Sequence, residues 1–140
     1  EGFESKVEVN DLSFFAPDSM ITAVKDYCKK TGQKVPETVG EIVLCVYSSL
    51  ADSYRRSVTQ IEELTGRKFS AINIVGGGCQ NVLLNELTAK ATGRKVVTGP
   101  IEATATGNLL AQMIACGDVK DLKAGRELVA RSFEIGEIEG

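Results

Sequence analysis

The chain has 140 residues, of which 43% are apolar and 25% are charged, so it suits a single globular domain with a real core. Its net charge of −3 and its pI of about 5.1 argue against nucleic acid or an anionic membrane as the main partner. No apolar run approaches the roughly 18 residues of a membrane span, and the N-terminus carries no signal-peptide pattern, so we expect a cytoplasmic protein. The absence of histidine excludes Ser-His-Asp and Cys-His catalysis and nearly all mixed His/Cys zinc sites.

The first 32 residues are expected to contain one helix. Residues 1–16 alternate only briefly between polar and apolar types, and we expect them to form a linker or a short edge strand. Residues 17–32 are predicted to be helical, because Pro17 and Asp18 suit a helix start and Gly32 suits a helix end. The apolar residues expected on its inner face are Met20, Ile21, Val24 and Cys28.

A longer helix is predicted from Thr38 to Gly66. Thr38 and Glu41 fit a capping box, and Gly66 provides the stop, which gives a helix of about 27 residues. This helix should run antiparallel to the one before it, so that residues 17–66 form a helical hairpin. Its apolar positions, which recur at three- to four-residue steps, are Val39, Val43, Val46, Leu50, Tyr54, Ile61 and Leu64. The charged residues expected to form only a solvated face are Arg55, Arg56, Glu62 and Glu63.

The spacing of the apolar residues changes after Gly66 from the helical to the strand type. Residues 71–75 form a short, mostly apolar run, as in a strand that is buried on both faces. The further predicted elements are a helix at 81–93 with Val82, Leu83, Leu87 and Ala91 inward, a strand at 95–99, and helices at 100–117 and 121–133. The order β-α-β-α-α implies parallel strands covered by helices. Because two strands make a thin sheet, we expect the chain to be part of something larger.

Three consecutive glycines, Gly76 to Gly78, join the first strand to the following helix. That order is typical of phosphate or nucleotide binding, because backbone N–H groups and the helix dipole point at the ligand. The Walker loop is excluded, since no lysine or hydroxyl stands in register, and the dinucleotide fingerprint lacks its third glycine, where Asn81 stands. Two interpretations stay open. One is a tight, closely packed turn; the other is a flat floor for the base or ribose of a nucleotide, with Asn81 capping the helix and donating an amide hydrogen bond.

A second stretch of small residues begins the helix predicted at 100–117. Glu102 suits the first turn of that helix, where the dipole favours an acid. Ala103, Ala105 and Gly107 would let the helix lie close to the sheet and to the glycine loop. Close packing is the interpretation that we favour for this motif over a ligand site.

In these residues the sequence resembles the C-terminal part of the FGGY family of carbohydrate kinases. The resemblance rests on residues 72–112, where the glycine loop, "LLN", "TGRKV" and "EATATGN" follow in the family's order and spacing. The helical stretches 17–42 and 49–67 resemble the branch of that family that acts on L-rhamnulose. The resemblance implies an α/β protein with the actin-like ATPase fold, which is built from ribonuclease-H-like domains. Residues 17–140 would be the later portion of the C-terminal domain, with residues 71–133 as its nucleotide-side βαβα unit.

The same resemblance implies an activity and a set of binding residues. The reaction would be transfer of the γ-phosphoryl group of ATP, with Mg²⁺, to the 1-hydroxyl of L-rhamnulose. Gly77 would contact ATP, with Gly76 and Gly78 beside it, and Asn81 would reach the adenine end. The family's Asp-containing motif for the catalytic base is not found here, so no catalytic residue is assigned and the chain alone should be inactive. Two alternatives stay open: another FGGY ketose kinase, acting on fuculose or xylulose, and a non-catalytic nucleotide-binding or dimerisation module.

The four cysteines include no CxxC pair, so a four-thiolate metal site is not expected. Cys79 and Cys116 are interpreted as buried free thiols. Cys28 and Cys45 lie a turn or two from the tip of the predicted hairpin and could face each other, and the resemblance implies that kinases of this kind can carry such a pair. A disulfide between them and two reduced thiols both stay open, because the cytoplasm normally keeps thiols reduced.

Overall fold

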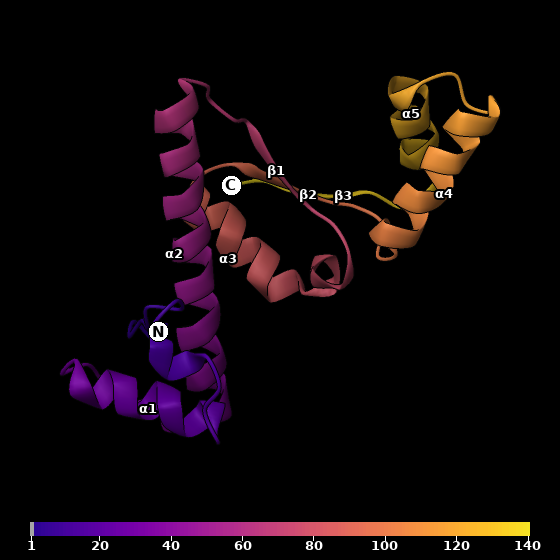
Figure 1. Cartoon of the computed structure of the whole chain (residues 1–140). Coiled ribbons are helices and arrows are strands. Elements are labelled where there is room, and N and C mark those ends of the chain that lie inside the picture. Colours follow the sequence, from indigo (N-terminus) through magenta and orange to yellow (C-terminus); the bar gives the residue numbers. More distant parts are fainter. Residues whose placement is uncertain (1) are drawn as a thin grey trace.

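The computed structural model describes residues 2–140 (Figure 1). Its elements, in chain order, are η1 (Leu12–Phe14), α1 (Met20–Lys30), α2 (Val39–Thr65), β1 (Ala71–Ile74), η2 (Gly77–Gln80), α3 (Val82–Thr92), β2 (Lys95–Thr98), α4 (Ala103–Cys116), α5 (Leu122–Ser132) and β3 (Gly136–Ile138). No helix within the described range is both long enough and apolar enough to span a membrane.

The first helix, α1, begins later than the sequence predicts. Ser19 is its N-cap, with its hydroxyl accepting a hydrogen bond from the backbone N–H of Thr22 at 3.3 Å, so Pro17 and Asp18 lie outside the helix. Figure 1 shows α1 lying across the beginning of α2, so the expected antiparallel course along α2 is wrong. The reason is that the N-terminal segment occupies the neighbouring face of α2: the backbone N–H of Val7 donates to the Ser49 hydroxyl at 2.9 Å.

The core of this helical part is small. Val7, Val24, Cys28 and Cys45 are buried together, which confirms the expected inward positions of Val24 and Cys28. Met20 and Ile21, also expected inward, are 49% and 53% exposed. Both lie on the first turn of α1, and Met20 lines a small hollow with Val46 and Leu50 of α2.

The N-terminal segment, expected as a linker or an edge strand over residues 1–16, forms no strand within residues 2–16. It is nevertheless anchored, because Ser5 is buried and its hydroxyl donates to the carbonyl of Lys34 at 2.8 Å. Residue 1 of that predicted segment lies outside the described residues.

The long helix α2 has the predicted ends. The Thr38 hydroxyl accepts from the Glu41 N–H at 3.2 Å, and the Glu41 carboxylate accepts from the Thr38 N–H at 3.1 Å, so the capping box is confirmed. Gly66 ends the helix in the left-handed conformation, with φ of 65°, which favours glycine. The helix spans the 27 residues expected from the sequence.

The buried face of α2 differs from the predicted one. Its fully buried residues are Cys45, Ser49, Ala51 and Glu62, whereas Leu64 and Val39 are 87% and 76% exposed. Helix α3 packs along α2 (Figure 1), and the residues that α3 buries are small or polar. The buried residues of α3 are Asn85, Thr88, Ala89 and Thr92. Of the residues expected inward on α3, Val82 and Leu83 are exposed, and Leu87 and Ala91 are partly buried.

The sheet has three strands in the order β1-β2-β3. Strands β1 and β2 are parallel, with Ala71 opposite Lys95, as the βαβ pattern predicts. Strand β3 pairs antiparallel with β2, with Ile138 opposite Val96, and the sequence analysis did not predict it. The expected burial of the first strand on both faces is wrong for the described residues, because Asn73 is exposed and the other three residues of β1 are only partly buried.

Helices α4 and α5 form a separate pair at the far end of the sheet (Figure 1). Asp121 caps α5 as predicted, since its carboxylate accepts from the Ala124 N–H at 2.8 Å. The two helices meet closely at Gly125, where an added Cβ would lie 2.8 Å from the side chain of Leu110. An apolar groove of about 460 Å³ lies between them.

Candidate functional site

The glycine loop begins at the carboxyl end of β1 and is fixed to the end of β2. Gly76 has φ of 78° and ψ of −167°, a conformation open essentially to glycine alone. Its N–H donates to the Pro100 carbonyl at 2.9 Å, and the Gly99 N–H donates to the Ile74 carbonyl at 2.8 Å. The carboxyl ends of the two parallel strands therefore form one edge, which is where open α/β sheets bind ligands.

Gly77 and Gly78 start the short 3-10 turn η2. Neither has a positive φ. A Cβ built on Gly77 would meet no atom within 4 Å, and one on Gly78 would be 3.9 Å from Ile74 Cγ2, an ordinary contact. Thus the conformation of the chain requires a glycine at Gly76, whereas neither conformation nor packing requires one at Gly77. The backbone of Gly77 is exposed, so a flat ligand can lie on it.

Asn81 stands at the start of α3 and caps it, as predicted. Its Oδ1 accepts from the Leu84 N–H at 3.1 Å. Its Nδ2 donates to the hydroxyl of Tyr47 on α2 at 2.8 Å. These bonds leave one amide hydrogen and one oxygen lone pair of Asn81 for a ligand. Tyr47 was missed by the sequence analysis, because it lies 34 residues earlier in the chain.

Asn85, one turn further along α3, is hydrogen-bonded to the loop. Its Nδ2 donates to the Cys79 carbonyl at 2.9 Å, and the residue is 1% exposed. Its Oδ1 is buried without a hydrogen-bond partner among the described residues. The bond from Asn85 to Cys79 was not predicted either, since nothing in the sequence distinguishes Asn85 from a surface asparagine.

The second stretch of small residues, at the start of α4, does not lie against the glycine loop. A Cβ on Gly107 would meet nothing within 4 Å, and Ala105 is exposed. The expected close approach of this helix to the sheet and the glycine loop is therefore wrong, because α4 packs on α5 at the far end of the sheet. Glu102 stands at the N-cap of α4 but makes no side-chain capping bond.

Glu62 is not the solvated residue that the sequence predicts. It is 4% exposed, and its carboxylate accepts from the Phe69 N–H at 3.0 Å, from Arg94 Nη2 at 2.7 Å and from Lys68 Nζ at 3.0 Å. The backbone bond from Phe69, followed by those from Arg94 and Lys68, lowers the pKa of Glu62 to about 2. The cluster ties the end of α2 to Phe69, shortly before β1, and to Arg94, directly before β2.

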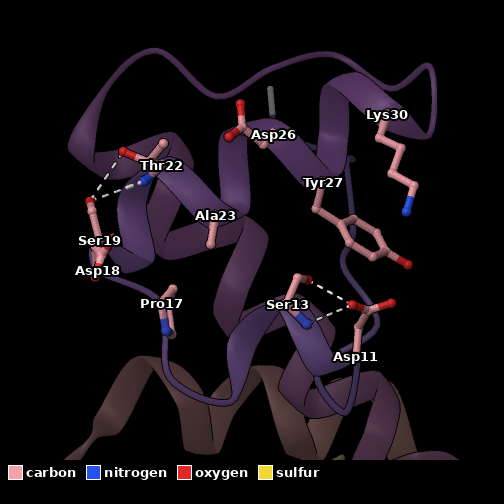
Figure 2. A pocket seen from close by; sticks show the side chains of 10 residues that line it. All are labelled: Asp11, Ser13, Pro17, Asp18, Ser19, Thr22, Ala23, Asp26, Tyr27 and Lys30. Carbon is pink, nitrogen blue, oxygen red and sulfur yellow. Dashed lines mark hydrogen bonds between the residues drawn. The ribbon is translucent and has the colours of Figure 1, made fainter.

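A polar hollow of about 470 Å³ between η1 and α1 is a competing candidate (Figure 2). Figure 2 shows carboxylates of Asp11, Asp18 and Asp26 around it, against one cation, Lys30. Hydrogen bonds from the side chain and backbone of Ser13 lower the pKa of Asp11, which keeps that group ionised. This charge disfavours a phosphate ligand, and the hollow shares no lining residue with the glycine loop.

The four cysteines are free in the structure. Cys28 and Cys45 are both buried, and burial together with the adjacent Cys28 raises the pKa of Cys45 to about 12. Cys79 is only partly buried and Cys116 is exposed, so the expectation that both are buried is wrong. Within residues 2–140, no group of three or more Cys, Asp or Glu side chains is arranged to hold a metal ion.

Comparison with known proteins agrees with the resemblance. Residues 6–116 match the sequence profile of the FGGY family of carbohydrate kinases, C-terminal domain. The chain is 47% identical over 133 residues to a rhamnulokinase of Halalkalibacterium halodurans and 46% identical over 135 residues to one of Bacillus subtilis. It is 41% identical over 135 residues to a rhamnulokinase of Bacteroides thetaiotaomicron. These matches cover 95%, 96% and 96% of this chain, which spans about 28% of the length of each relative.

Proposed function

The chain belongs to the FGGY family of carbohydrate kinases and has the actin-like ATPase fold of its C-terminal domain, and from this premise we propose that it is the nucleotide-binding segment of a larger kinase. That kinase would transfer the γ-phosphoryl group of ATP to the 1-hydroxyl of L-rhamnulose. Because the chain spans about 28% of its relatives, the sugar contacts and the catalytic base are expected in the rest of the protein.

The observation that carries the nucleotide assignment is the open backbone at Gly77. Gly77 is exposed at the carboxyl edge of the two parallel strands and needs glycine neither for its φ nor for packing, so its bare backbone leaves space for a ligand to lie on it. The planar base of a nucleotide has the flat shape that fits bare backbone, and its ribose can also lie there without meeting a Cβ. Asn81, at the start of α3, has one amide hydrogen and one lone pair left to meet the adenine end.

The residues present fit the nucleotide but supply no metal ligand. The stretch from Gly76 to Asn81 contains no carboxylate. Phosphoryl transfer uses Mg²⁺ to neutralise charge on the phosphates, so we propose that this ion is held by ATP itself and by residues outside the chain. The chain alone should therefore not phosphorylate a sugar.

The choice of sugar rests on relatives that are 41–47% identical and are rhamnulokinases. Another FGGY kinase, acting on fuculose or xylulose, is the alternative. A substrate panel with the complete protein decides between them, and we expect the highest kcat/KM with L-rhamnulose. A higher kcat/KM with L-fuculose or D-xylulose would replace the assignment.

Gly77→Val in the complete protein tests the nucleotide assignment. The branched side chain would fill the space beneath the nucleotide, so we expect the KM for ATP to rise about tenfold or more, which corresponds to about 1.4 kcal/mol. The KM for the sugar should stay within about twofold and the melting temperature should be unchanged. Equal rises in both KM values would point to a folding defect, and an unchanged KM for ATP would refute nucleotide binding at this loop.

A further inference from the structure

We infer that Tyr47 is a positioning residue of the nucleotide site: it holds the Asn81 amide in the orientation that an adenine nucleotide meets. The inference rests on the proposed function of the glycine loop. Tyr47 is partly buried on α2, and its hydroxyl oxygen accepts a hydrogen bond from Asn81 Nδ2 at 2.8 Å. This bond joins two helices across 34 residues of sequence at the point where the loop enters α3.

The two bonds of Asn81 fix its amide on both sides. The Leu84 N–H can only donate, so the amide oxygen must face it, and the 3.1 Å bond assigns that oxygen. The nitrogen then faces Tyr47. A neutral amide that is held at both ends keeps its remaining N–H and its remaining lone pair in fixed directions. Asparagine with a free donor and acceptor pairs with the N6 and N7 edge of adenine.

Tyr47 is itself part of a rigid support. Helix α2 packs along α3, and the Glu62 cluster fixes the end of α2 to the start of β2. Asn85 Nδ2 donates to the Cys79 carbonyl within the loop at 2.9 Å. The orientation of Asn81 is therefore set before a ligand arrives, and preorganisation of this kind lowers the cost of binding.

Tyr47→Phe in the complete protein removes the hydroxyl and keeps the ring. We expect the KM for ATP to rise about threefold to tenfold, the factor that one lost neutral hydrogen bond gives. The kcat and the KM for the sugar should stay within about twofold. Tyr54→Phe is the matched control, because Tyr54 lies two turns along α2, is 39% exposed, and has no hydrogen bond from its hydroxyl within residues 2–140. It should leave all three constants unchanged.

Asn81→Ser tests whether Tyr47 acts through Asn81. Serine keeps a capping oxygen but lacks the amide. In that background Tyr47→Phe should raise the KM for ATP no further. A full additional rise in the KM for ATP would overturn the inference. So would equal effects of Tyr47→Phe and Tyr54→Phe, or a Tyr47→Phe variant that lowers kcat and raises the KM values for ATP and sugar alike.

Gly77→Val separates this inference from the proposed function. If Gly77→Val raises the KM for ATP and Tyr47→Phe does not, the positioning role is refuted while the nucleotide site stands. If Gly77→Val leaves the KM for ATP unchanged, the nucleotide site and the role of Tyr47 are both refuted.

Discussion

Replacing Gly76 with alanine should destabilise the protein, whereas the same replacement at Gly77 should not. The two residues are neighbours in one loop and both gain a single methyl group. They differ in backbone conformation, because Gly76 has φ of 78° and ψ of −167°, whereas φ of Gly77 is not positive. The pair therefore separates the conformational need for glycine from the need for space.

The expected cost at Gly76 follows from its geometry. The added Cβ would lie 3.9 Å from the Ile101 carbonyl oxygen, an ordinary contact, so crowding contributes nothing. Holding alanine in a conformation open essentially to glycine costs about 1–3 kcal/mol. Alanine also reduces the freedom of the unfolded chain, which offsets roughly 0.4–1 kcal/mol of that cost. At the middle of these two ranges the net loss is about 1–2 kcal/mol.

Urea denaturation of the complete protein measures this difference. With a slope of about 2 kcal/mol per molar urea, the midpoint for Gly76→Ala should fall by about 0.5–1 M. Gly77→Ala should raise the midpoint by about 0.2–0.5 M, since its Cβ would meet no atom within 4 Å and alanine reduces the freedom of the unfolded chain. Equal shifts for the two variants would refute the reasoning, because they would show that the backbone at Gly76 does not require glycine.

Two further predictions concern buried groups. The pKa of Glu62 is lowered from an ordinary 4.5 to about 2, so its contribution to stability should be complete above pH 4.5 and lost as the pH falls toward 2. Urea midpoints from pH 6 to pH 2 should therefore show Glu62→Gln less stable than the wild type at pH 6 and equal to it near pH 2; a difference that does not change with pH would contradict this. Alkylation read by peptide mass should label Cys116 rapidly in the native protein and Cys28 and Cys45 only after unfolding, because the two thiols are buried and the pKa of Cys45 is raised to about 12. Failure to label Cys28 and Cys45 after unfolding without reductant would show that they form a disulfide.

Features that depend on neighbouring residues in the sequence were predictable. The capping box of Thr38 and Glu41, the stop at Gly66 and the cap at Asn81 are all present, because each is decided by contacts within a few residues. The two parallel strands were predictable for a similar reason, since the spacing of apolar residues in the sequence changes after Gly66.

Features that depend on distant partners were not predictable. Strand β3 forms because Ile138 pairs with Val96, about 40 residues earlier. Glu62 looks like a surface acid until Arg94 is placed beside it. The buried face of α3 is polar and small because α2 approaches it closely, and a hydrophobic pattern alone selects the wrong face.

The same division applies to the site. The three glycines and Asn81 were found from their order along the chain, since a strand, a glycine loop and a helix start lie together by connectivity. Tyr47 and Asn85 were missed, because their contacts with the loop come from packing of α2 and from the turn of α3. The sequence thus located the glycine loop and its helix cap but not the side chains that support them.

A crystal structure of the complete protein with a non-hydrolysable ATP analogue and L-rhamnulose tests the account most directly. We expect the adenosine part of the analogue to lie against the backbone of Gly76 to Gly78, with the Asn81 amide at the adenine end. An analogue bound elsewhere, with this loop open to solvent, would contradict the central claim.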